Sequence, residues 1–599
     1  MRGSSSDSGP TAESTGDRPG TERDLRAGLL DGLAVLLFCL GTLQLTWGIW
    51  FPGDPQQLAD TAVEAQSEGR ARRPTVAEAD QRFHLWLVAR NAYTLSHKPW
   101  AIFDAEPCYP AQHTLALGHP LISMGLLGVV PYLATGDPIA TYHFVVTVVH
   151  LIAALAMYLL IKDWTASRVA GIAAGLLFAF DPAKAGDPLY FFIPDTSWAV
   201  LALLFGRRFF ASGRWQDGLA TALFCSLLFA LDAYPLFSAA FVGLPLGIWM
   251  LVHYGVRNLR VGPTILTVAV LATAAYFVFG PYLELRDAQQ VLERKSQWLY
   301  TTWAVLLPGY GMGWLSFGLA VLACVVGRKR VLPGITGDPR WALVCGALLV
   351  AALATGGNFW MEQAAERRGE PLPISIPNFY ALVARVVPGL GSVRVPAHLA
   401  AGVHLAFSVL AGLGVAAIQS IAPQRSRPYV AAALIALAYA AALWPGLQGL
   451  APRGVYHRVT VAPSPESVEF YETLARLGNS GPLFEVPTGG RYAMTYSSTQ
   501  VLLSAYHHRR TSGCFAAFRP PGLGSVRSLG AELPDPEAVA ALRAMGFTTL
   551  VVHHPHGPSA GGGLVASLAA SAQQPEPMLK LLHGTHGLTA FNLQPLASE

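Results

Sequence analysis

The sequence predicts an all-α polytopic membrane bundle of about eleven spans with a re-entrant or outer-leaflet helix, followed by a small C-terminal extracytoplasmic α/β domain. Three observations predict this fold class. Hydrophobic residues make up 52% and charged residues 13% of 599 positions, and the mean hydropathy of +0.39 lies outside the range of soluble proteins. Apolar runs of span length recur to about residue 446. After about residue 464 the composition becomes that of a soluble domain.

The first 28 residues are rich in Ser, Gly and Thr and have no apolar core, so we expect a disordered cytoplasmic tail at 1–28. The first apolar run, 29–51, exceeds the roughly 20 residues that a span needs, and it begins the transmembrane domain at 29–449. The other expected spans are 139–161, 168–181, 189–206, 216–233, 234–253, 262–281, 310–327, 341–356, 397–421 and 428–446.

Basic residues fall on alternate connections between these spans. Short loops rich in Lys and Arg stay in the cytoplasm. The loop 52–138 and the tail 450–599 then lie on the opposite, extracytoplasmic face, which in a bacterium faces outward from the inner membrane. The basic positions are Lys162, Arg168, Arg207, Arg208, Arg214, Arg257, Arg260, Arg328, Lys329, Arg330, Arg425 and Arg427.

The segment 114–138 is apolar enough to suggest a further span. A crossing there would turn every later basic loop outward, and Pro120 and Pro131 interrupt the segment. We therefore expect it to be the re-entrant or outer-leaflet helix, packed against the bundle.

Acidic residues gather on the predicted external side. Carboxylates near a membrane are costly and usually functional, so their distribution predicts one polar cavity that opens outward. For Asp181 and Asp187, each followed by proline, an alternative is that they only end helices and start turns. Asp104 and Glu106, within PWAIFDAEPCYP at 99–110, are not needed for that purpose. The acids are Asp54, Asp60, Asp80, Asp104, Glu106, Asp181, Asp187, Asp195 and Asp232.

The tail alternates helix and strand patterns. SVEFYETLARLG and EAVAALRAMG predict helices, GPLFEVP and FTTLVVHH predict strands, and a helix near 562–572 with two strands near 578–592 completes the domain. Its histidines lack zinc-ligand spacing, so we expect no metal site there. Cys108 and Cys514 are both external in this topology, and whether they pair is left open.

Several stretches resemble integral-membrane C-type glycosyltransferases, the superfamily that uses lipid-phosphate sugars, in its bacterial branch with an external tail. ADQRFHLWLVARNAYTL, PWAIFDAEPCYP and GHPLISMGLLG resemble the first external loop. TASRVAGIAAGLLFAFDPAK resembles the third span and the loop after it, VPGLGSVRVPAHLA the start of a late span, and MTYSSTQVLLSAYHHRRTSGC the helix and strand of the tail. The family often has a second acid at Gln81, a second Arg at His398, and a His in the loop of Asp181 and Asp187.

The resemblance implies transfer of a sugar, of hexosyltransferase type and with inversion, from a polyprenyl-phosphate donor to a glycan, lipid or protein acceptor. Such a reaction needs a base. Asp80 is the first candidate by family position. Asp104 and Glu106 follow on chemistry, because a D-x-E pair can act as a base or hold a divalent cation through oxygen ligands. No cofactor is certain, and nucleic acid is excluded as a partner.

The remaining expected site residues bind substrate. Arg394 is the candidate for the departing phosphate, with His398 one helical turn onward. An alternative for Arg394 is that it snorkels to lipid head groups. Two rival functions remain, a transporter and a non-catalytic assembly protein of the cell envelope. The other expected substrate-binding residues are Asp181, Asp187, Asp195 and Asp232.

Overall fold

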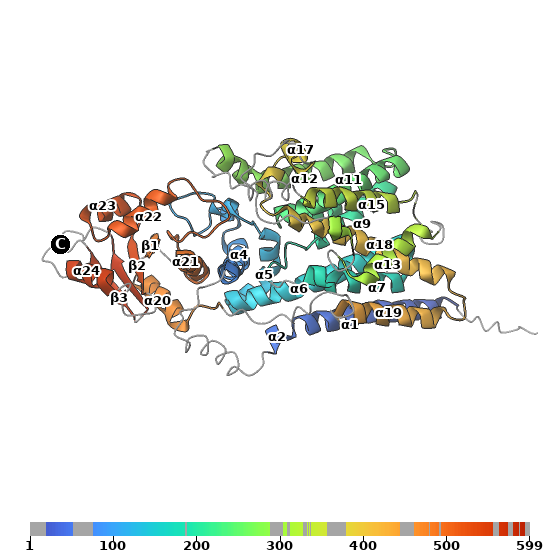
Figure 1. The fold of residues 1–599 in the computed structure, drawn as a ribbon, viewed down its shortest axis with the longest axis horizontal. Helices are drawn as coiled ribbons and strands as arrows, with labels where there is room; N and C mark the ends of the chain where they lie inside the picture. The colour runs from blue at the N-terminus through green and yellow to red at the C-terminus, as the bar shows by residue number, and fades with distance from the viewer. Residues whose placement is uncertain are drawn as a thin grey trace, which may run out of the picture.

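A computed structural model describes most of the chain. Figure 1 shows a helical bundle at one end, a small sheet with its helices at the other, and helices α4 and α5 between them. The described residues are 19–51, 76–185, 189–287, 303–307, 312–326, 332, 335, 337–355, 379–443, 461–477, 480–489, 493–554, 562–572, 579–585 and 587–593.

Each range expected to span the membrane contains a helix. Five helical segments are long and apolar enough to cross a membrane, so the chain is a polytopic membrane protein, while the full span count stays a prediction. The helices are α1 (Pro19–Leu45), α6 (Pro138–Thr165), α7 (Arg168–Phe180), α9 (Ser197–Ser212), α10 (Trp215–Phe229), α11 (Ala233–Tyr254), α12 (Val261–Asp287), α13 (Trp314–Val325), α15 (Arg340–Ala354), α18 (Ala401–Ile421) and α19 (Arg427–Leu443).

Short elements connect these helices. They are α2 (Trp47–Trp50), η1 (Pro99–Ala101), η2 (Thr114–Leu117), α8 (Pro182–Ala185), η3 (Trp303–Leu306), α17 (Phe379–Val386), η4 (Leu390–Ser392) and η5 (Pro396–Ala400). Two helices begin well away from their expected starts. Helix α1 begins at Pro19, inside the range 1–28 expected to be a disordered tail, and the helix predicted from residue 189 begins only at Ser197. Pro194 disfavours helical backbone in the residue before it, and the Asp195 carboxylate accepts a hydrogen bond from the Ser197 amide at 3.2 Å.

Glycines let the central helices approach closely. A Cβ at Gly175 of α7 would lie 2.7 Å from the Ala154 carbonyl oxygen of α6, and one at Gly414 of α18 would lie 2.0 Å from that of Leu319 in α13. Neither position has room for a side chain. Small residues at such contacts are the usual basis of helix packing in membranes, where the hydrophobic effect does not drive helices together.

The segment 114–138 forms the short element η2 and the longer helix α5 (Ile122–Thr135), which has 14 residues. Pro131 lies inside that helix. Helix α5 packs against α4 (Val76–His97), where the Asn91 side chain donates to the Pro120 carbonyl at 2.7 Å. The re-entrant or outer-leaflet placement of this segment stays a prediction.

The tail contains the predicted elements around a four-stranded sheet of order β1-β2-β4-β3. The first pair of strands is parallel and the other two pairs are antiparallel. Apolar side chains cover both faces, with Phe484 and Leu550 in one cluster and Leu483 and Val551 in the other. The elements are α20 (Pro465–Arg476), β1 (Leu483–Val486), α21 (Ala493–His507), α22 (Leu523–Glu532), α23 (Pro536–Ala544), β2 (Thr549–His553), α24 (Gly562–Ala572), β3 (Lys580–Gly584) and β4 (Leu588–Asn592).

The tail is joined to the loop that follows α4. Cys108 and Cys514 form a disulfide with a Cα–Cα distance of 4.4 Å, which settles the pairing that the sequence left open. Backbone hydrogen bonds extend the contact on both sides of it. The amides of Cys108 and Tyr109 donate to Gly513 and Thr511 at 2.9 Å each, the Thr511 amide donates to Glu106 at 2.9 Å, and the Phe518 amide donates to Leu117 at 2.8 Å.

Replacing Cys108 and Cys514 together by serine should lower the thermal unfolding midpoint of the purified protein. The disulfide joins residues 406 positions apart, and a cross-link of this kind typically contributes about 2–4 kcal/mol. Differential scanning fluorimetry under non-oxidising conditions measures the shift, with the free Cys345 replaced by alanine as the control. A double variant that unfolds at the wild-type midpoint would contradict this role.

Candidate functional site

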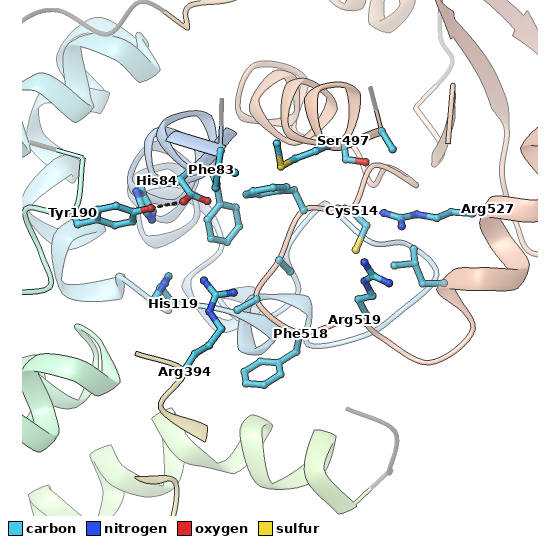
Figure 2. Close-up of a pocket in the computed structure, with 18 residues that line it drawn as sticks. Phe83, His84, His119, Tyr190, Arg394, Ser497, Cys514, Phe518, Arg519 and Arg527 are labelled. Carbon is cyan, nitrogen blue, oxygen red and sulfur yellow. Dashed lines mark hydrogen bonds between the residues drawn. The ribbon is translucent and has the colours of Figure 1, made fainter. Parts of the chain in front are cut away.

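A cavity of about 400 Å³ lies where the tail meets the first loop and the end of the bundle. Helix α4 forms one wall and α21, α22 and the segment 514–519 form the other. His119, Tyr190 and Arg394 reach it from loops at the end of the bundle (Figure 2). Residues more than 400 positions apart in the sequence therefore share one site.

Asp80, in the first turns of α4, is the acid that lines this cavity. The Tyr190 hydroxyl donates a hydrogen bond to its carboxylate, drawn as the dashed line in Figure 2. Burial raises the pKa of Asp80 above its ordinary value, although this hydrogen bond and the nearby Arg394 and His119 act in the opposite direction. The carboxylate is thus a stronger base than an exposed one, with a positive group nearby.

His119 faces the same cavity and is oriented by Asp232. The Nδ1 atom of His119 lies 2.5 Å from a carboxylate oxygen of Asp232. The other carboxylate oxygen accepts the Tyr234 amide at 3.0 Å, which caps α11. A buried carboxylate on Nδ1 leaves the opposite ring nitrogen available to the cavity. Asp232 itself does not line the cavity, so it acts through His119, a residue that was not among the expected site residues.

The loop that carries Tyr190 is held at both ends. At one end, the carbonyl of Leu189 lies 3.0 Å from Nδ1 of the buried His84. Burial lowers the pKa of His84 to about 3, so the ring is neutral and donates to this carbonyl. At the other end, the Lys184 ammonium lies 2.8 Å from the Asp195 carboxylate, and both side chains are fully buried. Asp195 therefore fixes the loop and does not line the cavity.

The other expected binding residues differ in where the structure places them. Asp181 ends α7 and accepts the Gly313 amide at 3.1 Å, whereas Asp187 lies outside the described residues. Arg394 lines the cavity as expected. His398 does not line the cavity, and its ring lies edge-on to that of Tyr234 at a centroid distance of 5.1 Å.

Asp104 and Glu106 do not line the cavity, which corrects the expectation that the acids gather in one pocket. Glu106 is buried, and its carboxylate lies 3.1 Å from Nε of the buried Arg90 of α4. The same guanidinium donates to the carbonyls of Ile102, of Ala101 at 3.2 Å and of Asp104 at 3.0 Å. The chain keeps Glu106 because it neutralises the arginine that organises the loop 99–110.

The side chain of Asp104 points away from this buried pair. It lies 3.5 Å from Nδ1 of His113, whose Nε2 atom lies 3.3 Å from the Glu284 carboxylate. The divalent cation considered for Asp104 and Glu106 therefore finds two carboxylates that do not converge. Among the described residues, no group of three or more His, Cys, Asp or Glu side chains is arranged to hold a metal ion.

Comparisons with known proteins find matches among solved structures, at low sequence identity. No protein-family model and no curated protein matches the chain. Solved structures that align with it include ArnT from Cupriavidus metallidurans bound to undecaprenyl phosphate, with 11% identity, a TM-score of 0.46, and coverage of 96% of this chain and 98% of ArnT. The apo state of that ArnT aligns with 12% identity and a TM-score of 0.45, over 96% of this chain and 99% of ArnT.

The arabinofuranosyltransferase AftD from Mycobacteria aligns with 14% identity and a TM-score of 0.49, over 95% of this chain and 42% of AftD. Because the identities and TM-scores are low, we base the function on the residues of the site.

Replacing Arg90 by methionine should destabilise the protein by about 3–5 kcal/mol, because it leaves the buried Glu106 carboxylate without its partner. The thermal midpoint of the purified protein measures the loss. Arg476→Met removes an exposed arginine of α20 and is the control, which should unfold near the wild-type midpoint. Equal midpoints for Arg90→Met and the wild type would show that this arginine does not hold the loop.

Proposed function

We propose that this protein is a membrane glycosyltransferase that moves a sugar from a polyprenyl-phosphate donor to an acceptor on the extracytoplasmic face. The observation that carries the proposal is that Asp80 and Arg394 line one cavity, with Tyr190 and His119 beside them. Transfer from a phosphate ester needs a base for the acceptor and positive charge for the departing phosphate. This cavity offers both.

Asp80 is the base. Burial raises its pKa and so increases its affinity for a proton, while the hydrogen bond from Tyr190 favours the ionised form. The carboxylate takes the proton of the acceptor hydroxyl as the acceptor oxygen attacks the anomeric carbon. The bond between that carbon and the phosphate oxygen breaks, and the electron pair leaves with the phosphate. Attack opposite the leaving group inverts the anomeric carbon, as in hexosyltransferases of this type.

Arg394 receives the departing phosphate. It lies two residues before η5, which leads directly into the apolar helix α18. A lipid phosphate that reaches this end of the bundle would present its head group to Arg394, whose planar fork matches phosphate oxygens. His119, oriented by Asp232, supplies a second nitrogen toward the same region. Mere snorkelling of Arg394 to head groups does not require an oriented histidine and a buried carboxylate beside it.

The arrangement also bears on the rival functions. A non-catalytic assembly protein is expected to carry dispersed carboxylates that face solvent separately, as Asp104 does. Asp80 and the His119–Asp232 pair instead converge on one cavity. A transporter is expected to hold its substrate at mid-depth, whereas this cavity lies at the end of the bundle beside the tail, which favours the transferase.

Replacing Asp80 by asparagine should reduce sugar transfer by about 10²–10⁴-fold, the usual contribution of a general base. The assay incubates purified full-length protein with a panel of prenyl-phosphate sugars and detects sugar release and transfer by mass spectrometry. Asp104→Asn, which lies outside the cavity, is the matched control and should retain activity. Equal turnover in the wild type and Asp80→Asn would exclude Asp80 as the base.

Replacing Tyr190 by phenylalanine should shift the acidic limb of the pH profile of kcat/KM to higher pH. The hydrogen bond from Tyr190 lowers the pKa of Asp80, so its removal raises that pKa. Because the base works only when ionised, activity is then lost at a higher pH as the solution is acidified. At pH values above the acidic limbs of both the wild type and the variant, the variant should approach the wild-type kcat/KM. An unshifted limb with a uniformly lower rate would contradict this electrostatic role.

A further inference from the structure

The cavity carries a second positive group, formed by Arg519 and Arg527 of the tail. Both line the cavity, and their guanidinium groups lie beside one another near Cys514, on the side away from Tyr190 (Figure 2). Among the lining residues, Asp80 is the one carboxylate. Within the part of the chain that the structure describes, neither arginine forms an ion pair with a carboxylate.

The charges in the cavity separate into two groups. Asp80 experiences the charges of Arg394 and His119. Burial and the charge of the neighbouring Arg519 both lower the pKa of Arg527. Like charges that are held together repel, and partial burial weakens the screening by water. An anion bound between the two guanidinium groups would relieve this repulsion.

The tail holds these arginines in place. Arg527 donates to the Cys514 carbonyl at 3.2 Å, and its own carbonyl accepts the Thr488 hydroxyl at 2.8 Å. Arg519 follows Phe518, whose amide donates to the Leu117 carbonyl at 2.8 Å. The disulfide at Cys514 fixes the same segment to the first loop. The Arg527 guanidinium is therefore held by a hydrogen bond, and the backbone that carries the exposed Arg519 is anchored beside it. Guanidinium forks placed in this way bind tetrahedral or planar oxyanions through paired hydrogen bonds.

We propose that Arg519 and Arg527 bind a phosphate or carboxylate group of the acceptor, so that this enzyme glycosylates an anionic acceptor. The inference rests on the proposed function, which assigns Arg394 to the phosphate of the donor. Arg394 lies in the bundle segment that leads into α18, whereas Arg519 and Arg527 belong to the tail. An acceptor anchored at Arg519 and Arg527 reaches along the cavity and presents its hydroxyl to Asp80.

The first test measures anion binding without turnover. Full-length protein in detergent is titrated calorimetrically with glycerol 1-phosphate, a soluble phosphate monoester that also carries hydroxyls, and with glycerol as the neutral comparison. Arg519→Gln combined with Arg527→Gln should weaken phosphate binding by about tenfold or more, as expected for lost charge-assisted hydrogen bonds. Arg476→Gln, an exposed arginine of the tail, should bind as the wild type does.

Further arms separate the two phosphate sites and the two sources of phosphate. Arg394→Gln, which removes the group proposed for the donor phosphate, should leave a single site for glycerol 1-phosphate that depends on Arg519 and Arg527. Nanodiscs of phosphatidylglycerol, compared with nanodiscs of phosphatidylcholine, test whether a lipid head group can occupy the site in place of a soluble ester. Binding that depends on Arg519 and Arg527 supports the proposal. Whether it is seen with glycerol 1-phosphate or with the phosphatidylglycerol nanodiscs identifies the source of the phosphate. Arg519→Gln alone, at an exposed position, should already weaken binding if the double variant folds poorly.

Wild-type binding by the double variant in both arms would overturn the proposal, as would complete loss of binding in Arg394→Gln alone. Failure of the proposed function is distinguishable from either result. If no prenyl-phosphate sugar is turned over while binding depends on Arg519 and Arg527, the anion site stands and the transferase does not. If transfer proceeds while binding is independent of both arginines, the transferase stands and the anion site does not.

Discussion

The attachment of the tail to the first loop is the constraint on which the site depends. The Cys108–Cys514 disulfide and the backbone hydrogen bonds on both sides of it hold the segment 511–518 against 106–117. Without this attachment, Asp80, Tyr190 and Arg394 would face open water. With it, α21, α22 and the segment between them close a cavity over these residues, and burial changes the protonation behaviour of Asp80.

The first loop has its own internal support, which explains where its acids lie. Buried Arg90 gathers the carbonyls of the loop 99–110 and is neutralised by Glu106. The buried ion pair between Lys184 and Asp195 joins the two ends of the loop that carries Tyr190. Two buried ion pairs therefore position the polypeptide around the cavity, while Asp80 remains available for chemistry. Acids near one face of a membrane protein thus divide into those that position loops and one that lines the site.

Much of the fold was predictable from the sequence because it follows from periodicity. Apolar runs gave the bundle helices, and amphipathic and alternating patterns gave α20, β1, α23 and β2. Asp80 and Arg394 were also predictable, from family position. The residues that support the site were not predictable. Arg90 resembles any polar residue on an amphipathic helix, and His119 is a single histidine beside a proline. Arg519 and Arg527 enter the site only through a contact between segments more than 400 residues apart.

The central claim is that a lipid-linked phosphate binds at Arg394 with its sugar directed toward Asp80. An experimental structure of the full-length protein with a bound polyprenyl phosphate tests it most directly. We expect phosphate oxygens at about 3 Å from the Arg394 guanidinium, with His119 adjacent and Asp80 across the cavity. A phosphate held elsewhere on the bundle, with Asp80 facing away from it, would contradict the account.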